Sequence, residues 1–394
     1  MHPLEKLWNK DKRLVIGLMS GTSADGVDAA LCEISGYGEE TKLKELEFVF
    51  VPFEEELRSH ILHMAEGKAV NAEEFCRLKT LLGIIYGEAC LELCRKAGLE
   101  PAQIDLVGCH GQTVWHAPQA EDYLGCSFPS TLQIGEEAEI AQLMNCPVVG
   151  DFRVRDVAAG GQGAPLVPYT EYLLYRSDDE CVALQNIGGI GNITIMPSHC
   201  MLSELTAFDT GPGNMVIDAL VSRYTDGAQT YDDGGRIAAS GKVSEELLAF
   251  LMDDPYLDRR PPKTTGREVY GNEYVDKLAS KAKSLGISME DTIATATRFT
   301  AETIACGIKN FADEMPAKLI VNGGGSHNLT MLRDLAQLLP ETEVLTGQQL
   351  GHDPDAKEAV AFALLANEFI FAQPNNAPAA TGAPRPVVMG KLSL

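Results

Sequence analysis

The sequence predicts an α/β protein made of two domains with related halves. Three observations lead to this expectation. A chain of 394 residues is longer than one ordinary hydrophobic core accommodates. Short apolar runs of strand length occur together with longer segments of helical periodicity. Glycine-rich loops follow several of the strand-like runs, and the ends of strands are where α/β sheets bind ligands.

The first strand-like segments are residues 14–18 and 27–34, which predict a β-hairpin. The loop between them favours phosphate binding, because glycine lets the backbone approach an anion and hydroxyl groups donate hydrogen bonds. Asp25 is a candidate ligand for magnesium. A plain hairpin turn is the alternative, and no Walker-type lysine follows. The loop reads Ser20-Gly21-Thr22-Ser23-Ala24-Asp25-Gly26.

Composition excludes several classes of partner. The chain has 32 Lys and Arg against 56 Asp and Glu, a net charge of −24, so neither nucleic acid nor an anionic membrane is an expected partner. Residues 1–13 are charged and lack an apolar centre, so no signal peptide is expected, nor is any apolar run long enough to span a membrane. The ten cysteines form no CxxC pair, which favours reduced, buried thiols.

Two helices are predicted after the hairpin, a short one over residues 55–66 and a long one over 71–97. Asn71 and Glu74 have the spacing of a capping box, and Gly98 is placed to end the long helix. One apolar face recurs at spacings of three and four residues, formed by Phe75, Leu78, Leu82, Ile85, Ala89 and Leu93.

A short strand over residues 104–109 is expected to end in a polar loop. His110, Gln112 and Thr113 follow the strand directly, which favours contacts with a substrate. A solvated loop is the alternative. Further strands are predicted over residues 131–135 and 148–152.

Residues 151–168 combine two arginines and two aspartates with a glycine-rich loop. Arg153 or Arg155 is a candidate contact for a substrate carboxylate or phosphate. Alternatively, both arginines pair with Asp151 and Asp156. The glycines suggest a hinge or a close ligand approach, and a domain boundary is expected here. The expected domains are residues 1–150 with about 376–394, and residues 151–375.

The second half repeats the opening pattern. Residues 182–187 and 193–196 predict strands joined by a turn that contains Gly188 and Gly189. A strand, a glycine loop and another strand therefore open each half. This repetition suggests two related halves that hold one nucleotide, each with its own phosphate loop.

Asp209 is the strongest candidate for a catalytic carboxylate. It is expected at a strand end, on a loop framed by Gly211 and Gly213 that leads into a helix near Asn214. Capping of that helix by Asp209 is the alternative. The surrounding glycines leave room for a ligand, which favours the catalytic role.

The remaining chain predicts a helix over residues 291–311 and a strand over 318–321. Three glycines follow this strand and would let a base or ribose lie on the backbone: Gly323, Gly324 and Gly325. An amphipathic helix is expected over residues 355–372, with Glu358 a candidate substrate contact or a solvated side chain. The tail, residues 386–394, is expected to return to the first domain as a strand.

These stretches together resemble the anhydro-N-acetylmuramic acid kinases. The matching segments occur in family order across nearly the whole chain, and Ala24 stands where the family often has leucine. They are GLMSGTSADGVD (17–28), HGQT (110–113), DFRVRDVAAGGQGAPLVP (151–168), NIGGIGN (186–192), FDTGPGN (208–214), NGGGSHN (322–328) and TGAPRPVVMG (381–390).

The resemblance implies an actin-like, sugar-kinase/Hsp70-type α/β fold with two domains and ATP in the interdomain cleft. It implies a cytoplasmic, homodimeric enzyme of cell-wall recycling that converts 1,6-anhydro-N-acetylmuramate, ATP and water to N-acetylmuramate 6-phosphate and ADP. The ATP loop corresponds to residues 21–28, which include Val27 and Asp28, with Mg²⁺ as the accompanying ion. The catalytic aspartate corresponds to Asp209. A plain sugar kinase of the same fold and a non-catalytic ATP-dependent binding protein are the alternatives.

Overall fold

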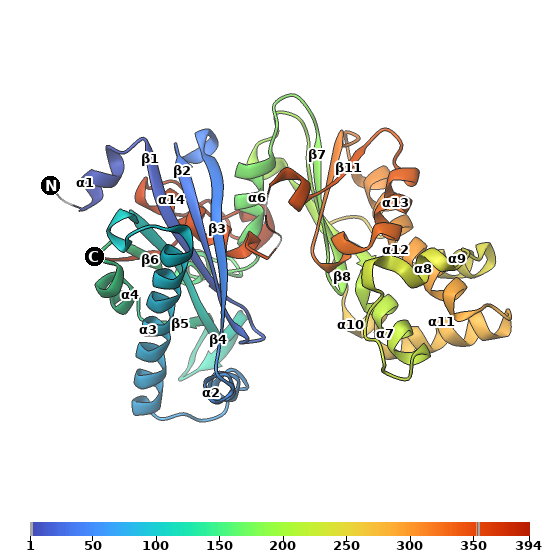
Figure 1. The fold of residues 1–394 in the computed structure, drawn as a ribbon, viewed down its shortest axis with the longest axis horizontal. Helices are drawn as coiled ribbons and strands as arrows, with labels where there is room; N and C mark the ends of the chain where they lie inside the picture. Colours follow the sequence, from blue (N-terminus) through green and yellow to red (C-terminus); the bar gives the residue numbers. More distant parts are fainter. Residues whose placement is uncertain (1–2, 352, 354) are drawn as a thin grey trace. The chain divides into compact units, whose positions relative to one another are not determined.

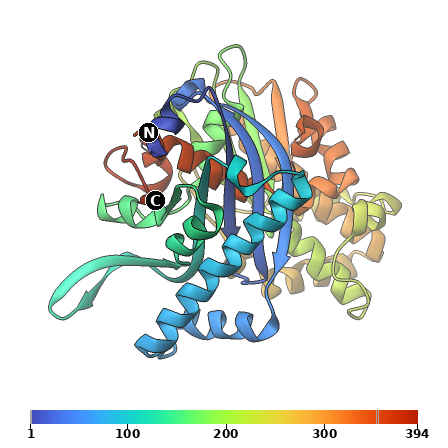
Figure 2. The same cartoon turned by 60° about the vertical axis from the view of Figure 1, so that its left-hand side comes forward.

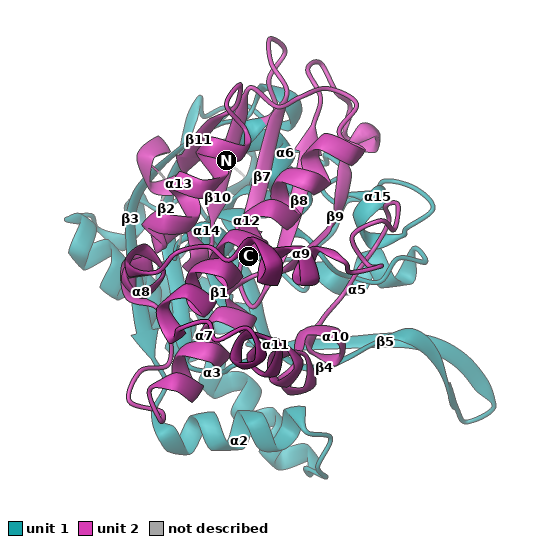
Figure 3. Cartoon of the chain, turned by 90° about the vertical axis from the view of Figure 1, so that its right-hand side faces the viewer, with its two compact units in different colours: residues 1–175, 355–394 teal, residues 176–354 magenta. Residues whose placement is uncertain are grey.

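The computed structural model describes residues 3–351, 353 and 355–394. Two compact units divide the chain (Figures 1 and 3). The first unit contains residues 1–175 and 355–394, and the second contains residues 176–354. No helix in the described ranges is long and apolar enough to cross a membrane.

These boundaries differ from the expected ones, since residues 151–175 and 355–375 belong to the first unit. Packing explains the difference. Helix α14 (Lys357–Ile370) contacts β1, β2 and β4 of the first unit, and α5 (Phe152–Ala158) contacts β5. A domain is defined by its shared core, and these helices complete the core of the first unit.

The first unit is built on a seven-stranded sheet with the order β12-β6-β4-β1-β2-β3, and β5 pairs with β4. The strands β1, β2 and β3 are antiparallel, whereas β4 runs parallel to β1 and β6 parallel to β4. The expected C-terminal strand is confirmed as β12, which pairs with β6. The strands are β1 Lys12–Ser20, β2 Gly26–Ser35, β3 Lys42–Pro52, β4 Leu106–Tyr123, β5 Cys126–Ile134, β6 Val148–Gly150 and β12 Lys391–Ser393.

The prediction of a polar loop over residues 110–113 is wrong, because β4 continues through these residues to Tyr123. Beyond Cys109 the strand pairs mainly with β5, beginning with Gln112 opposite Ile134. Figure 2 shows this β4–β5 hairpin extending away from the rest of the first unit. Such a continuation depends on a partner strand, which local polarity does not reveal.

Two glycines let helix α14 lie directly on the sheet. Gly17 of β1 and Gly108 of β4 are opposite each other in the parallel pair. A Cβ atom would lie 1.8 Å from the Ala359 carbonyl oxygen at Gly17 and 2.1 Å from the Phe362 carbonyl oxygen at Gly108. The expectation of an amphipathic helix is therefore wrong. Apart from its ends α14 is buried on all sides, including every residue from 359 to 368.

The long helix α3 follows from local signals. The side chain of Asn71 accepts a hydrogen bond from the backbone N–H of Glu74, and Gly98 ends the helix with φ +69°. The predicted apolar face packs on the sheet within the core. The helices of this unit are α1 Pro3–Trp8, α2 Glu55–Ala65, α3 Ala72–Ala97, α4 Glu137–Met144, α5, α6 Val167–Tyr175, α14 and α15 Pro378–Thr381, with 3₁₀ turns at Gly38–Glu40 and Pro101–Gln103.

The second unit has a five-stranded sheet with the order β11-β10-β7-β8-β9. The strands are β7 Val182–Ile187, β8 Ile190–Met196, β9 Thr206–Pro212, β10 Lys318–Asn322 and β11 Glu343–Thr346. The helices are α7 Asn214–Tyr224, α8 Arg236–Ser240, α9 Glu245–Met252, α10 Arg267–Tyr270, α11 Asn272–Ser284, α12 Met289–Phe311 and α13 Leu329–Leu338, with 3₁₀ turns at Leu202–Glu204, Asp233–Gly235, Gly324–His327 and Gly347–Leu350.

Both units share one topology. In each, three antiparallel strands are followed by two parallel strands that lie on the other side of the first strand. The repeated opening seen in the sequence therefore corresponds to a repeated sheet, and the predicted two-domain α/β fold of the actin-like class is confirmed.

Candidate functional site

The loop between β1 and β2 presents an exposed row of polar side chains. Thr22, Ser23 and Asp25 are exposed, so their hydroxyl and carboxylate groups are free to meet a ligand. Ala24 is buried beneath them and has φ +52°. The backbone N–H of Ala24 donates to the Gly21 carbonyl oxygen at 3.1 Å, which closes a tight turn. The neighbouring Val27 is fully buried, so only its backbone is available to a ligand.

Gln112 braces this loop from the adjacent strand. Its Oε1 accepts a hydrogen bond from the Ser20 hydroxyl at 2.6 Å, and its Nε2 donates to the Gly21 carbonyl oxygen at 3.0 Å. Gln112 is 1% exposed, so its role in this structure is to hold the loop. Thr113 is half-buried, and its hydroxyl accepts a hydrogen bond from Gln133.

Two carboxylates from distant parts of the sequence lie near each other in the first unit. Asp28 is half-buried on β2, and Glu358 lies in the first turn of α14. Burial raises the pKa of Asp28 to about 6, and the negative charges of Glu358, Asp355 and Asp25 add to the effect. Perturbed carboxylates of this kind are concentrated at functional sites.

The raised pKa predicts that Asp28→Asn stabilises the protein at pH 8. Because the folded pKa, about 6, exceeds the ordinary value of 3.8, the folded state binds more protons than the unfolded state between these values. The ionised Asp28 carboxylate therefore lowers the free energy of unfolding by its full amount above pH 6, and this destabilisation disappears as the pH falls toward 4. Allowing for solvent screening, we expect Asp28→Asn to raise the free energy of unfolding by about 1 kcal/mol at pH 8 and to leave it unchanged below pH 4.

Urea denaturation at several pH values measures this gain. Asp122→Asn is the matched control, because Asp122 is exposed on β4 and its replacement should change the free energy of unfolding little. An Asp28→Asn protein with no gain at pH 8 would show that the carboxylate is not destabilised in the folded state.

The buried His110 pairs with the half-buried Arg153 in the first unit. Arg153 Nε donates to His110 Nε2 at 2.8 Å, and Arg153 Nη1 donates to the Gly163 carbonyl oxygen at 2.7 Å. Burial, together with the positive charge of Arg153, lowers the pKa of His110 to about 3, so the imidazole is neutral. Arg155 is exposed. Arg153 is therefore the arginine that this structure brings toward Glu358.

The two aspartates beside these arginines have other partners. Asp151 pairs with Lys391. Asp156 accepts hydrogen bonds from the Gly163 N–H at 2.8 Å, from Asn376 Nδ2 at 2.7 Å and from the Thr381 hydroxyl at 2.9 Å. The alternative prediction, that Arg153 and Arg155 pair with Asp151 and Asp156, is therefore wrong.

In the second unit, Asp209 lies within strand β9 and not on the expected loop. The register of β8 and β9 shifts directly after it: Asn192 is opposite Asp209, but Gly191 is opposite Gly211. Thr210 is therefore the extra residue of a β-bulge. Bulges redirect neighbouring side chains and are frequent beside active sites.

The carboxylate of Asp209 is held from two sides. Its Oδ1 accepts from Asn192 Nδ2 at 2.9 Å, and its Oδ2 accepts from the backbone N–H of Thr265 at 2.9 Å. Helix α7 is not capped by Asp209, since Gly213 occupies the N-cap position without a side-chain bond. Asp209 is half-buried. Its carboxylate retains lone pairs that can accept a proton from a bound water.

The glycine turns of the second unit pack tightly together. The N–H groups of Gly213 and Asn214 donate to the carbonyl oxygens of Gly189 and Gly188 at 2.9 and 2.7 Å. A Cβ at Gly323 or Gly325 would overlap atoms of Asn186 and Ile187 in β7, whereas Gly324 lines a pocket. Of the three predicted glycines, Gly324 is thus the one that faces a ligand-sized space.

That pocket has a volume of about 600 Å³ and lies within the second unit. Burial raises the pKa of Asp218 to about 6, and the charge of Asp232 adds to the effect. Sequence reasoning missed Asp218, which is an ordinary helix residue in the sequence. The pocket is lined by Asn214, Ile217, Asp218, Thr230, Tyr231, Asp232, Asp233, Gly234, Gly324, His327 and Asn328.

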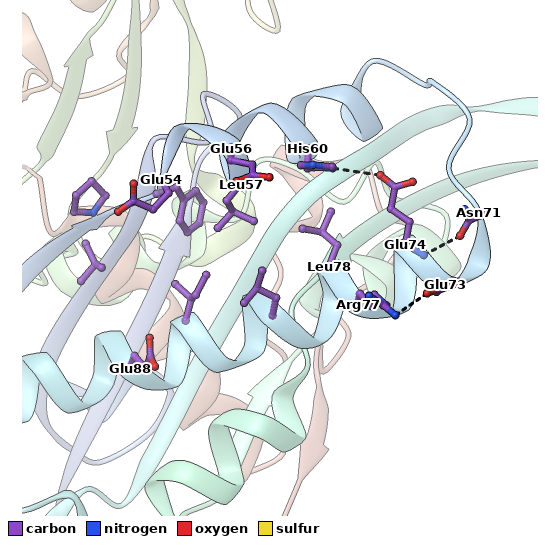
Figure 4. Close-up of a pocket in the computed structure, with 15 residues that line it drawn as sticks. Glu54, Glu56, Leu57, His60, Asn71, Glu73, Glu74, Arg77, Leu78 and Glu88 are labelled. Carbon is purple, nitrogen blue, oxygen red and sulfur yellow. Dashed lines mark hydrogen bonds and ion pairs between the residues drawn. The ribbon is translucent and has the colours of Figure 1, made fainter.

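A second pocket, of about 800 Å³, lies between helices α2 and α3 of the first unit (Figure 4). Its floor is apolar, and its rim includes Glu74, which pairs with His60, and Glu73, which pairs with Arg77. None of the predicted site residues lines this pocket. Among the described residues, no group of three or more His, Cys, Asp or Glu side chains is arranged to hold a metal ion.

Two α/β units that share one sheet topology define the actin-like fold class. The first unit carries a hydroxyl-rich loop, and the second carries glycine turns beside a pocket. The family model for anhydro-N-acetylmuramic acid kinase matches residues 13–393. The chain therefore belongs to the anhydro-N-acetylmuramic acid kinase family.

Curated relatives and a solved structure are also similar to the chain. The anhydro-N-acetylmuramic acid kinase of Caldanaerobacter subterraneus subsp. tengcongensis is 50% identical over 100% of both chains. That of Clostridioides difficile is 44% identical over 96% of this chain and 97% of the relative. The activator of 2-hydroxyisocaproyl-CoA dehydratase from Clostridium difficile with bound ADPNP has a TM-score of 0.43 and 11% identity, over 91% of this chain and 96% of that one.

Proposed function

We propose that the chain is an ATP-dependent kinase that opens the 1,6-anhydro ring of 1,6-anhydro-N-acetylmuramate with water and phosphorylates the sugar at O6. The products are N-acetylmuramate 6-phosphate and ADP. The main observation behind this proposal is the carboxylate of Asp209, oriented by Asn192 and by the Thr265 N–H in a member of this family.

The mechanism assigns one carboxylate to the hydrolytic step. Asp209 accepts a proton from water as the water oxygen bonds to the anomeric carbon, and the bond from that carbon to the bridging oxygen breaks. The released O6 attacks the γ-phosphorus of ATP, and ADP leaves. Glycosidases usually need a second carboxyl group to protonate the leaving oxygen. Here the phosphoryl group takes the place of that proton, so one base suffices.

Each unit, taken by itself, has groups that suit a ligand of this reaction. The pocket of the second unit suits the nucleoside, because Asp218 can accept hydrogen bonds from ribose hydroxyls and Gly324 leaves space for a flat base. Thr22 and Ser23 of the first unit suit the phosphates. Arg153 suits the substrate carboxylate, with Glu358 as a contact for a substrate hydroxyl.

The carboxylates of Asp25 and Asp28 fit a magnesium ion, which proteins usually hold through one or two carboxylates together with substrate phosphates. Asp25 is exposed at the loop, and Asp28 is close enough to Asp25 for their charges to interact. The ion would neutralise charge on the ATP phosphates. A cytoplasmic location and a homodimer complete the proposal, and both rest on the family resemblance.

Isotope labelling tests the proposed reaction. We expect that 1,6-anhydro-N-acetylmuramate, ATP and magnesium in ¹⁸O-water yield a sugar phosphate with one heavy oxygen at C1, because water attacks that carbon. Mass spectrometry of the product measures the label, and incubation of unlabelled product in ¹⁸O-water controls for anomeric exchange. An unlabelled phosphosugar would indicate a plain sugar kinase. Bound ATP without any product would indicate a binding protein.

A further inference from the structure

A segment of which the proposed mechanism uses only the Thr265 N–H lies along the open edge of strand β9. Residues 253–266 connect α9 to α10, and we call them the strap. Strand β9 is the last strand of its sheet, so one row of its backbone groups has no partner strand. The Asp209 N–H donates to the Lys263 carbonyl oxygen at 3.1 Å, which satisfies this edge at the site.

The strap binds Asp209 at two further points. The Tyr256 hydroxyl donates to the Asp209 carbonyl oxygen at 2.8 Å, and the Thr265 N–H donates to the carboxylate at 2.9 Å. Both ends of the strap therefore contact one residue. A change in the path of the strap would withdraw a hydrogen bond from the carboxylate itself.

The side chain of Lys263 holds the strap closed. Lys263 is 6% exposed, and its Nζ donates to the Leu257 carbonyl oxygen at 3.1 Å and to that of Tyr256 at 3.4 Å. The Nζ lies 4.7 Å from the ring centroid of Tyr256, 4.9 Å from that of Phe311 and 5.5 Å from that of Phe208. These distances are those of cation–π contacts.

No ion pair involving Lys263 occurs among the described side chains. An ammonium group without a carboxylate partner is costly to bury, and its burial lowers the pKa of Lys263 from the ordinary value. The charged groups that act on it are Asp254, Asp258, Arg259 and Asp209.

We propose that Lys263 is a positioning residue for Asp209. Its side chain fixes the path of the strap, so that the Thr265 N–H keeps its hydrogen bond to the catalytic carboxylate. The proposal rests on the proposed role of Asp209 as the base. Lys263 does not touch the reacting atoms. It acts through the two ends of the strap, and its positive charge also favours the ionised carboxylate.

The test compares Lys263→Met with the wild type in steady-state kinetics. We expect kcat to fall about 10-fold to 100-fold, because a small misplacement of a catalytic group has an effect of this size, while KM for ATP changes little. We also expect the acidic limb of the plot of kcat against pH to shift to higher pH, by about one unit. Loss of a hydrogen bond and of a nearby positive charge both disfavour the ionised carboxylate. A purely structural role would leave this limb in place.

Lys277→Met is the matched control, since Lys277 is exposed on α11 and should leave kcat and the pH profile unchanged. Tyr256→Phe is the second variant. It removes only the hydroxyl that donates to Asp209 and keeps the ring beside Lys263, and we expect kcat to fall several-fold. If Lys263→Met does not fold, Tyr256→Phe decides the test, and an unchanged kcat in that variant overturns the proposal.

Asp209→Asn separates this proposal from the proposed function. A wild-type protein without turnover overturns the proposed function, and normal turnover in Asp209→Asn overturns the role of Asp209. If Asp209→Asn is inactive while a folded Lys263→Met keeps both its kcat and its acidic limb, only the role of Lys263 is overturned.

Discussion

Replacement of Asp209 by asparagine is expected to lower kcat by about 10²-fold to 10⁴-fold, the usual contribution of a positioned general base. Asparagine has the same shape and still offers an oxygen to the Thr265 N–H. The Asn192 amide can turn to meet its NH₂ group, so the strand and the strap should keep their structure. The side chain loses only its capacity to accept a proton from water. Release of ADP in the presence of the anhydro sugar measures the effect.

Asp226→Asn is the control for this experiment. Asp226 is exposed and has φ +51°, a conformation that asparagine also adopts readily. It should keep wild-type turnover, and both variants should bind ATP as the wild type does. Turnover of Asp209→Asn within about threefold of the wild type would exclude Asp209 as the base, since a positioned base contributes far more than this.

Replacement of Gly17 by alanine is expected to lower the free energy of unfolding of the first unit by about 3 kcal/mol or more. The new Cβ would lie 1.8 Å from the Ala359 carbonyl oxygen and 2.6 Å from the Ala363 backbone nitrogen. Both atoms belong to the backbone of α14, so relief requires the whole helix to move. That movement would also shift Glu358 away from Asp28. Calorimetry should show a fall in Tm of about 6–12 °C for a unit of this size.

Gly21→Ala is the matched control for stability. A Cβ at Gly21, directly after the same strand, meets only the Ser23 hydroxyl oxygen, at 3.8 Å. Its free energy of unfolding should stay within about 0.5 kcal/mol of the wild type. A Gly17→Ala protein as stable as Gly21→Ala would contradict the close packing of α14 on β1.

Features with short-range causes could be predicted from the sequence. Helix α3 has its cap at Asn71, its apolar stripe and its terminal Gly98 within one segment, and the structure confirms all three. The hairpin of β1 and β2 and the helix α7 after Gly213 follow from similarly local patterns. The segments that resemble the family are likewise contiguous, so the sequence alone sufficed for the class of enzyme.

The incorrect expectations have non-local causes. Residues 110–113 look like a loop, but β5 supplies a partner that extends β4 through them. Helix α14 has small residues on several faces, and only its contacts with β1, β2, β4 and α6 explain why it is buried all round. The strap and the bulge at Thr210 likewise depend on pairing between segments that are far apart in the sequence.

The reactive groups and the local elements that present them can be read from the amino-acid sequence, because hydrogen bonds within helices and hairpins join residues that are near in the chain. Which of these groups lie close together depends on the fold of the whole chain. Glu358 lies near Asp28 because Gly17 and Gly108 admit α14 to the sheet, and Thr265 reaches Asp209 because Lys263 closes the strap. Such meetings depend on packing and burial, and these are properties of the folded chain as a whole.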